Sequence, residues 1–184
     1  MALTQEHDDV IRHLALLAAR VIESIDPRLV PVTGAGIGYA VTGARDDTGV
    51  AAVKGGIKTT GKSVSLGGPC AFGTNDRVSP VILTAMKFDP AIRSAAVLHF
   101  SPAMSDILED MLLECCSFDP LREPPGITTM DWGVASCCRD GVPDVIYNRS
   151  TPKKEPLLRF FGENPEAVGN NIIMLSNRII PIEL

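Results

Sequence analysis

The stretch Val32–Ala40, VTGAGIGYA, continues as VTGARDDTG and sets the kind of sheet that the chain can form. Its three glycines look like the loop of a dinucleotide-binding βαβ unit. In that unit the loop opens a helix, whereas here strand-forming residues and an Asp-Asp turn follow. No acidic residue stands in the strand expected about 20 residues further on. The stretch therefore predicts strands and turns rather than a nucleotide-binding fold.

The glycines of this stretch leave two interpretations open. Gly34, Gly36 and Gly38 could form a turn, Thr33–Gly38, that binds phosphate through backbone N–H groups. The same glycines could instead serve only the shape of the chain. We carry Gly34 and Gly36 forward as candidate binding residues.

The rest of the chain mixes helices and strands. Apolar residues at i+3 and i+4 spacing predict a helix over Thr4–Ile25 with Thr4 as its N-cap. Further helices are expected at 79–88, 101–114, 131–141 and 166–176, and strands at AAVLHF (95–100), CCSF (115–118), DVIYN (144–148) and PLLRFFG (156–162). Because strands and helices do not alternate strictly, we expect one α/β domain, residues 1–184, with a mixed sheet.

Composition excludes several classes of protein. The net charge is −5 and aromatic residues make up 5%, so neither a basic surface nor a base-stacking platform is expected, and we predict no nucleic-acid binding. No run reaches the roughly 18 apolar residues of a membrane span. The N-terminal residues carry acids where a secretory signal would carry a basic patch. We expect a cytoplasmic protein without a membrane partner.

The five cysteines are Cys70 and two adjacent pairs, Cys115-Cys116 and Cys137-Cys138. Their odd number and the length of the chain favour reduced, structural thiols. Neighbouring cysteines tend to point apart, which disfavours zinc, and the three histidines lack ligand spacing. We therefore expect no metal site. Neither a GxSxG motif nor a cysteine with an obvious histidine partner supports nucleophilic catalysis.

Charged residues gather in two polar loops that follow apolar strands. FDPLREPPG (118–126) contains Asp119, Arg122 and Glu123, and NRSTPKKEP (148–156) contains Arg149, Lys153, Lys154 and Glu155. Thr129, Asp131 and Trp132 adjoin the first loop, and Trp132 is most simply a half-buried packing residue. Loops at strand ends often carry the sites of α/β proteins. The alternative is a set of charged, solvated turns.

We predict that these loops meet the glycine turn at one cleft. The expected phosphate-binding cations are Arg77, Arg122, Arg149 and Lys154, with the Gly34–Gly38 backbone at the rim. Asp119 and Glu155 accompany them, and Lys87 is a further candidate. Two phosphate-bearing ligands would need several cations and backbone donors close together.

These motifs occur in a familiar order. VPVTGAGIGYA (30–40), AFGTNDRVSPVILTAMKFDPAIRSA (71–95), SFDPLREPPG (117–126), TTMDWGV (128–134) and PDVIYNRSTPKKEPLLRFFG (143–162) together resemble the ThiN family. These are thiamine-phosphate synthase domains, usually archaeal, fused behind a hydroxymethylpyrimidine kinase or a helix-turn-helix domain. The resemblance covers roughly residues 15–167.

The resemblance implies a three-layer α/β/α fold with a mixed, mostly antiparallel sheet, related to the class II aldolases. It also implies a reaction that joins hydroxymethylpyrimidine pyrophosphate to thiazole phosphate, giving thiamine phosphate and pyrophosphate. The family carries an arginine in a Gly-Arg-Ile segment and a histidine in a Phe-Gly-Ala-Ser-x-His segment. The matching positions here are Gly56 and Arg77, and Gly36 stands where the family commonly has asparagine.

Two functions follow from these departures. The replaced residues favour a domain that binds thiamine phosphate, or its pyrimidine and thiazole phosphate precursors, with weak or no turnover. The alternative is an active synthase, in which Arg77 supplies positive charge, Lys54 or Lys58 reaches the space at Gly56, and Mg²⁺ takes part. An interaction role beside a separate kinase or regulator is a third possibility. We also expect a homodimer.

Overall fold

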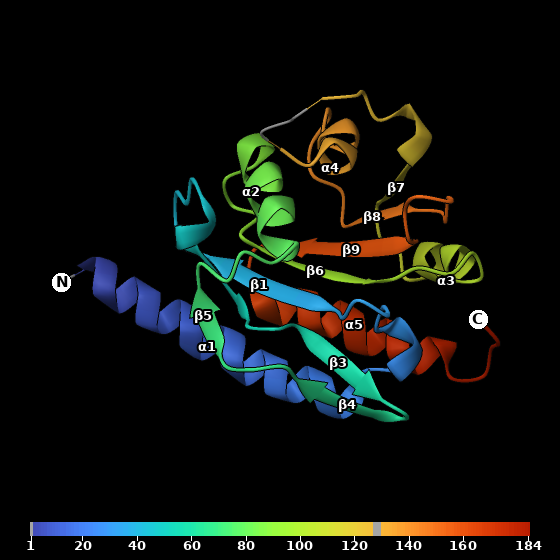
Figure 1. Ribbon diagram of the computed structural model, residues 1–184, viewed down its shortest axis with the longest axis horizontal. Helices are drawn as coiled ribbons and strands as arrows, with labels where there is room; N and C mark the ends of the chain where they lie inside the picture. The colour runs from blue at the N-terminus through green and yellow to red at the C-terminus, as the bar shows by residue number, and fades with distance from the viewer. Residues whose placement is uncertain (1, 127–129) are drawn as a thin grey trace.

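A computed structural model describes residues 2–126 and 130–184 (Figure 1). Its helices are α1 (Ala2–Ser24), α2 (Val78–Phe88), α3 (Met104–Asp110), α4 (Trp132–Cys137) and α5 (Pro165–Ile179), with 3-10 turns η1 (Pro27–Leu29), η2 (Asp47–Gly49) and η3 (Pro120–Arg122). Its strands are β1 (Gly36–Ala40), β2 (Val50–Val53), β3 (Ile57–Thr60), β4 (Ser63–Leu66), β5 (Cys70–Phe72), β6 (Ser94–His99), β7 (Cys115–Phe118), β8 (Val145–Asn148) and β9 (Leu157–Gly162).

Seven of these strands form one sheet in the order β5-β2-β1-β6-β9-β8-β7. Within the described residues every neighbouring pair is antiparallel except β7 and β8, which are parallel and joined by a crossover that contains η3 and α4. Strands β3 and β4 form a separate hairpin. The expected mixed, mostly antiparallel sheet is confirmed.

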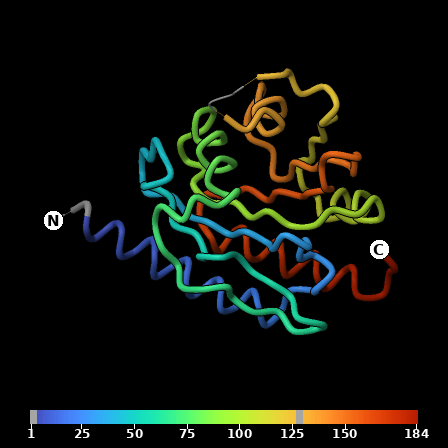
Figure 2. Tube along the Cα trace, viewed as in Figure 1, coloured from blue at the N-terminus to red at the C-terminus, as the bar shows by residue number. Residues whose placement is uncertain are grey.

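Helices cover both faces of the sheet and give three layers (Figure 1). On one face, α1 and α5 run side by side (Figure 2) and enclose the larger apolar core with the inward residues of the strands. On the other face, α2 and α4 cover a smaller core. The expected α/β/α architecture is therefore confirmed.

The first helix follows its sequence pattern closely. The predicted stripe of Val10, Leu14, Leu17, Val21 and Ile25 is buried along its whole length. The helix begins at Ala2, so Thr4 lies inside it and the predicted N-cap is wrong. A Cβ atom on Gly169 of α5 would lie 2.3 Å from Leu17 Cδ1, so the missing side chain lets the two helices approach closely.

Two other helix starts and ends differ from the prediction. Helix α2 begins at Val78, one residue before the predicted start, and the N–H of Val78 donates to Asp76 Oδ1 at 2.9 Å, which satisfies one donor of its first turn. Helix α3 spans only Met104–Asp110, shorter than the predicted 101–114. Leu112, inside the predicted range, has a φ of 59° beyond the helix end and is 92% exposed. The left-handed backbone turns its side chain out.

The ends of the last two helices also differ from the prediction. Helix α4 starts after the predicted Asp131 but ends at Cys137, not near Gly141, and α5 extends past the predicted Ser176 to Ile179.

Cys116 and Cys137 form a disulfide, so the expectation of reduced thiols is wrong for this pair. Adjacent residues of a strand face opposite sides of the sheet. Cys116 therefore faces α4, while its neighbour Cys115 packs against the core of α1 and α5.

Candidate functional site

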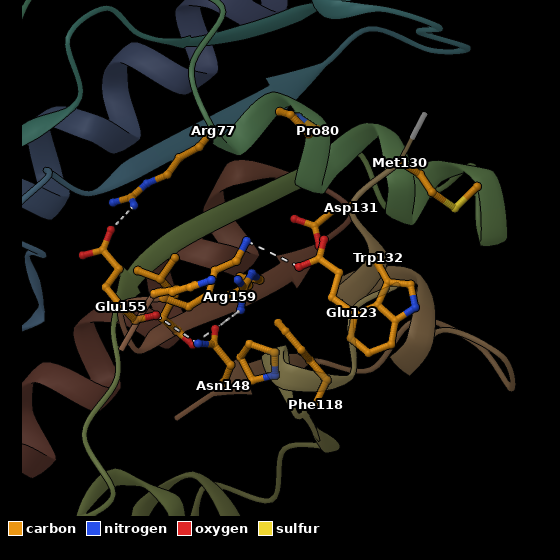
Figure 3. Close-up of a pocket in the computed structure, with 15 residues that line it drawn as sticks. Arg77, Pro80, Phe118, Glu123, Met130, Asp131, Trp132, Asn148, Glu155 and Arg159 are labelled. Atoms are coloured by element: carbon orange, nitrogen blue, oxygen red, sulfur yellow. Dashed lines mark hydrogen bonds and ion pairs between the residues drawn. The ribbon is translucent and has the colours of Figure 1, made fainter. Parts of the chain in front are cut away.

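A cavity of about 580 Å³ opens on the face of the sheet covered by α2 and α4. We call it the central cavity. Its walls come from the start of α2, the end of β7, the start of α4, and the β8–β9 connection (Figure 3). The described lining side chains that carry charge are Arg77, Glu123, Asp131, Lys153, Lys154, Glu155 and Arg159. They amount to four positive and three negative charges.

Arg159 lies at the centre of this group (Figure 3) and is only 6% exposed. It comes from β9, where Nη1 donates to Asn148 Oδ1 of β8 at 3.0 Å. Its guanidinium carbon lies 5.1 Å from the centre of the Phe118 ring. Burial lowers the pKa of Arg159, Asp131 opposes that effect, and Arg77 adds to it. Water is thus largely removed from one positive charge of the cavity.

Arg77 occupies the opposite wall and links three segments. One of its nitrogens, Nη1, donates to Glu155 Oε1 at 2.5 Å, and Nη2 donates to the carbonyl of Gly34 at 2.6 Å. Thr33 Oγ1 also donates to Glu155 Oε1, at 2.7 Å. Burial raises the pKa of Glu155, but the bonds from Thr33 and Arg77 outweigh it, so the net shift is downward. Glu155 is therefore held as a carboxylate near neutral pH.

The two charged loops approach each other across the central cavity. Lys154 Nζ lies 3.4 Å from Glu123 Oε2, which joins the β8–β9 loop to the loop after β7. Asn148 Nδ2 donates to the carbonyls of Arg149 and Glu155, at 3.1 and 2.9 Å, and so fixes the shape of the second loop from within. The cavity wall is thus tied to β8 by a buried amide.

Aromatic side chains form the remaining wall. Phe118 and Trp132 pack edge to face, with ring centres 6.0 Å apart. A Cβ atom on Gly133 would lie 2.3 Å from the Phe118 ring, so only glycine allows α4 to settle against this ring. The N–H of Val134 donates to Asp131 Oδ1, and the N–H of Asp131 donates to Thr84 Oγ1 of α2. Trp132 is half-buried, as predicted.

A smaller cavity of about 300 Å³ lies beyond Arg77, against the glycine turn. We call it the glycine cavity. Its described lining is Thr33, Gly34, Ala35, Gly36, Gly55, Gly56, Asp76 and Arg77. Both positions at which the chain departs from the family pattern of charge, Gly56 and Arg77, therefore line this cavity. Burial raises the pKa of Asp76, the bond from Val78 opposes this, and Asp47 adds to it.

The glycines here have separate structural roles. Gly34 has a φ of 94° and Gly56 a φ of 73°, conformations that favour glycine. Gly36 and Gly38 belong to β1, where Cβ atoms would crowd Val78 and Ile82 of α2. The N–H groups of Gly34 and Ala35 already donate to Pro31 and Ile57. The turn therefore does not present these two amides to a phosphate, and the predicted turn ends at Gly36, where β1 begins.

A third cavity, of about 680 Å³, adjoins the central one and shares Phe118, Pro120 and Trp132 with it. We call it the outer cavity. Asp119, Arg122 and Arg149 line it. The side chain of Arg122 is 83% exposed and its Nε lies 3.9 Å from Asp119 Oδ2. Arg122 and Arg149 thus lie on the other side of Phe118 and Trp132 from the central cavity.

The predicted residues therefore fall into groups. Arg77, Lys154 and Glu155 meet at the central cavity, Gly34 and Gly36 lie next to it at the glycine cavity, and Asp119, Arg122 and Arg149 line the outer cavity. Lys87, in the last turn of α2, lines none of these three cavities. Thr129 lies outside the described residues. The binding roles of all these residues stay predictions.

Sequence reasoning missed Arg159 and Asn148. The available signal was a single arginine inside the otherwise apolar strand Leu157–Gly162, since such a charge is rarely buried without a purpose. It also missed His99 of β6, whose pKa is lowered by burial and raised in part by Glu155.

Among residues 2–126 and 130–184, no group of three or more His, Cys, Asp or Glu side chains is arranged to hold a metal. Nor is any described helix long and apolar enough to cross a membrane.

These features define a class, an α/β/α domain with a basic, aromatic-walled cavity on one face of a mixed sheet. A family model described as thiamine-phosphate synthase ThiN matches residues 17–174. The chain therefore belongs to the ThiN family.

Relatives with names and structures agree with this assignment. The chain is 32% identical over 160 residues to the bifunctional thiamine biosynthesis protein ThiDN of Methanocaldococcus jannaschii, covering 85% of this chain and 38% of that protein. It is 30% identical over 111 residues to thiamine-phosphate synthase ThiN of Methanothermobacter thermautotrophicus, covering 56% of this chain and 58% of that protein. The chain thus spans less than two thirds of either relative.

A solved structure supports the fold along almost the whole chain. The C-terminal domain of a phosphomethylpyrimidine kinase superposes with a TM-score of 0.83 at 28% identity, covering 92% of this chain and 100% of that one. The arrangement of layers and strands described above is therefore that of a known domain.

Proposed function

We propose that this domain binds thiamine phosphate, or its pyrimidine and thiazole phosphate precursors, in the central cavity and turns them over slowly or not at all. The observation that carries the proposal is the composition of that cavity. It combines a buried guanidinium, Arg159, with the side chains of Phe118 and Trp132. Thiamine phosphate and its precursors likewise combine aromatic rings with phosphate, so cations and apolar rings suit them.

The weak turnover is argued from the two family positions. Gly56 carries no charge, and its positive φ suits glycine. Arg77 keeps a positive charge but donates to Glu155 and Gly34, and a guanidinium does not exchange a proton near neutral pH. A family histidine at this position could do so. The chain thus retains binding groups while lacking the titrating one.

Titration calorimetry tests the binding. We expect thiamine phosphate, or at least one of the two phosphorylated precursors, to bind with a dissociation constant below 1 mM, on the order of −4 kcal/mol or better. Arg139→Ala is the control: it removes an exposed arginine outside the three cavities and should leave the affinity nearly unchanged. Absence of binding by all three compounds at millimolar concentration would overturn the proposal.

An active synthase is the second candidate, and one contact favours it. A Cβ atom on Gly34 would lie 3.9 Å from Lys58 Cγ, so Lys58 stands beside the glycine cavity, where the family arginine is missing. Lys54 lies instead against Gly68. A coupled assay with both precursors and Mg²⁺ separates the two functions. A rate that falls in Lys58→Ala but not in Lys54→Ala would favour the synthase.

Two further expectations accompany the proposal. The domain is expected to act in the cytoplasm and to form a homodimer. Analytical ultracentrifugation with and without thiamine phosphate tests the oligomeric state, and a monomer under both conditions would contradict it.

A further inference from the structure

We propose that the floor of the central cavity is an oxyanion site, in which Arg159 binds a phosphate or pyrophosphate group and Asn148 positions it. The inference rests on the proposed function only for the identity of the molecule that carries the group.

The first step is the charge of Arg159. Two other cations of the cavity have carboxylate partners: Arg77 pairs with Glu155, and Lys154 with Glu123. Within the described part of the chain Arg159 forms no ion pair, although it is the most deeply buried of these cations. A buried cation without an anion in contact costs free energy, which a bound oxyanion would remove.

The second step concerns hydrogen-bond donors. Arg159 uses Nη1 for Asn148 Oδ1 and, at 3.5 Å, for the carbonyl of Leu157. Its Nε is buried and has no hydrogen-bond partner among the described residues. Buried donors in proteins are nearly always satisfied, so an unpartnered Nε shows that the guanidinium has fewer acceptors around it than its charge calls for. An oxyanion at the guanidinium supplies acceptors for the fork of donors that arginine presents.

The third step is preorganisation. Asn148 is 2% exposed, and its amide is used on both sides, because Oδ1 accepts from Arg159 while Nδ2 donates to two loop carbonyls. The Phe118 ring supports the guanidinium from another direction. A cation held in this way loses little freedom when it binds a ligand. Asn148 is therefore a positioning residue for Arg159.

Calorimetry with inorganic pyrophosphate at fixed ionic strength tests the site. Arg159→Lys keeps one positive charge but loses the fork of donors, and we expect binding to weaken by about tenfold or more. Arg139→Lys makes the same change at an exposed arginine outside the three cavities and should bind as the unchanged protein does. Equal affinity of a folded Arg159→Lys protein would overturn the inference.

A second variant tests the charge without removing the arginine. Asn148→Asp keeps the size of the side chain and its acceptor, but it loses the Nδ2 donors to the two loop carbonyls and places a carboxylate next to Arg159 that competes with the ligand. We expect a similar loss of pyrophosphate binding. Should either variant fail to fold, the Nε–H resonance of Arg159 in the unchanged protein decides. It must shift on addition of pyrophosphate, and an unmoved resonance at saturation contradicts the proposal.

Three ligands separate this inference from the proposed function. If Arg159→Lys weakens thiamine phosphate but not unphosphorylated thiamine, the oxyanion site and the function both stand. If thiamine phosphate binds the variant and the unchanged protein equally, the function stands and the site is wrong. If pyrophosphate binding depends on Arg159 but thiamine phosphate does not bind, the site stands and the function falls.

Discussion

The two faces of the sheet are built differently. On the face of α1 and α5 the helices are long and meet the sheet through a continuous apolar core. On the face of α2 and α4 the core is smaller, and a buried arginine, a disulfide and a cavity lie beside it. Most of the stabilisation from buried apolar surface therefore comes from the first face. The second face can hold buried charges, whose desolvation costs free energy, because the first face offsets that cost.

The difference is also visible in how polar groups are treated. On the first face, Arg28 joins Asp26 to the carbonyls of Ile179 and Ile182, so each charge has a partner. On the second face, Arg159 has no ion-pair partner among the described residues, although Asp131 acts on it electrostatically, and burial raises the pKa of Asp76. The second face therefore combines paired charges, such as Arg77 with Glu155, with polar groups whose charge is not balanced.

The largest expected effect removes a side chain from the first face. Leu14→Ala leaves a cavity between α1 and the sheet and should lower the free energy of unfolding by about 3 kcal/mol. Leu16→Ala on the same helix, where the side chain is 67% exposed, should change it by less than about 0.5 kcal/mol. Urea denaturation measures both. The comparison of faces fails if the folded Leu14→Ala protein has lost ligand binding.

The next effect concerns the covalent link on the second face. Cys116→Ser opens the bond to Cys137, 21 residues away, and should lower the free energy of unfolding by about 3 kcal/mol. A reductant should lower the stability of the unchanged protein by a similar amount and leave that of Cys116→Ser unaltered. If the unchanged protein is insensitive to the reductant, the link contributes nothing to this face.

A smaller effect is expected at Gly56. An arginine there restores the family residue but must adopt a φ of 73°, with a Cβ atom 2.9 Å from the Ala35 carbonyl oxygen. We expect Gly56→Arg to cost about 2 kcal/mol. Gly61→Ala, at a φ of 63° with open space around it, should cost about 1 kcal/mol because only the backbone is strained. If both substitutions lower the free energy of unfolding equally in urea denaturation, the Cβ atom at position 56 does not clash with the Ala35 carbonyl.

The smallest effects are those of pH, and their signs differ between the faces. The bond from Arg28 lowers the pKa of Asp26 below 3.8, so its contribution is full above about pH 4 and is lost as pH falls through the folded pKa. Burial raises the pKa of Asp76 above 3.8, so its charged form destabilises the fold, and this is relieved as pH falls through that higher pKa.

The two aspartates can be compared directly. Asp26→Asn should lower stability at pH 7 and lose its effect in acid, whereas Asp76→Asn should raise stability slightly at pH 7 and lose its effect in acid. Denaturation midpoints between pH 3 and pH 7 measure both. Effects of the same sign would mean that the faces do not differ in how they treat carboxylates.

Local patterns made the first face predictable. The apolar residues from Val10 to Ile25 recur at helical spacing, and that spacing alone predicts which side of the helix is buried. The β7 and β8 strands were equally clear from their apolar runs. The pairing of three short strands, β3 to β5, was not predictable, because it depends on contacts with β2 and of these strands with each other.

The second face depends on contacts that local patterns do not contain. Arg159 is buried because β9 lies inside the sheet, between β6 and β8, and because the Phe118 ring lies against its guanidinium. Cys116 and Cys137 meet because β7 and α4 are packed together, which a count of cysteines does not reveal. The polar loops were identified from composition, but Phe118 and Trp132 divide them between two cavities, and only packing decides on which side Arg122 and Arg149 lie.

The bond between Cys116 and Cys137 turns the β7–β8 crossover into a closed ring of chain. The side chains that this segment gives to the central cavity all lie within the ring: Phe118, Pro120, Glu123, Met130, Asp131 and Trp132. Its two closing residues are fixed to each other regardless of what the ring contains. The bond therefore fixes both ends of the segment that supplies the aromatic wall of the central cavity, while β8 and β9 supply Asn148 and Arg159 from outside the ring.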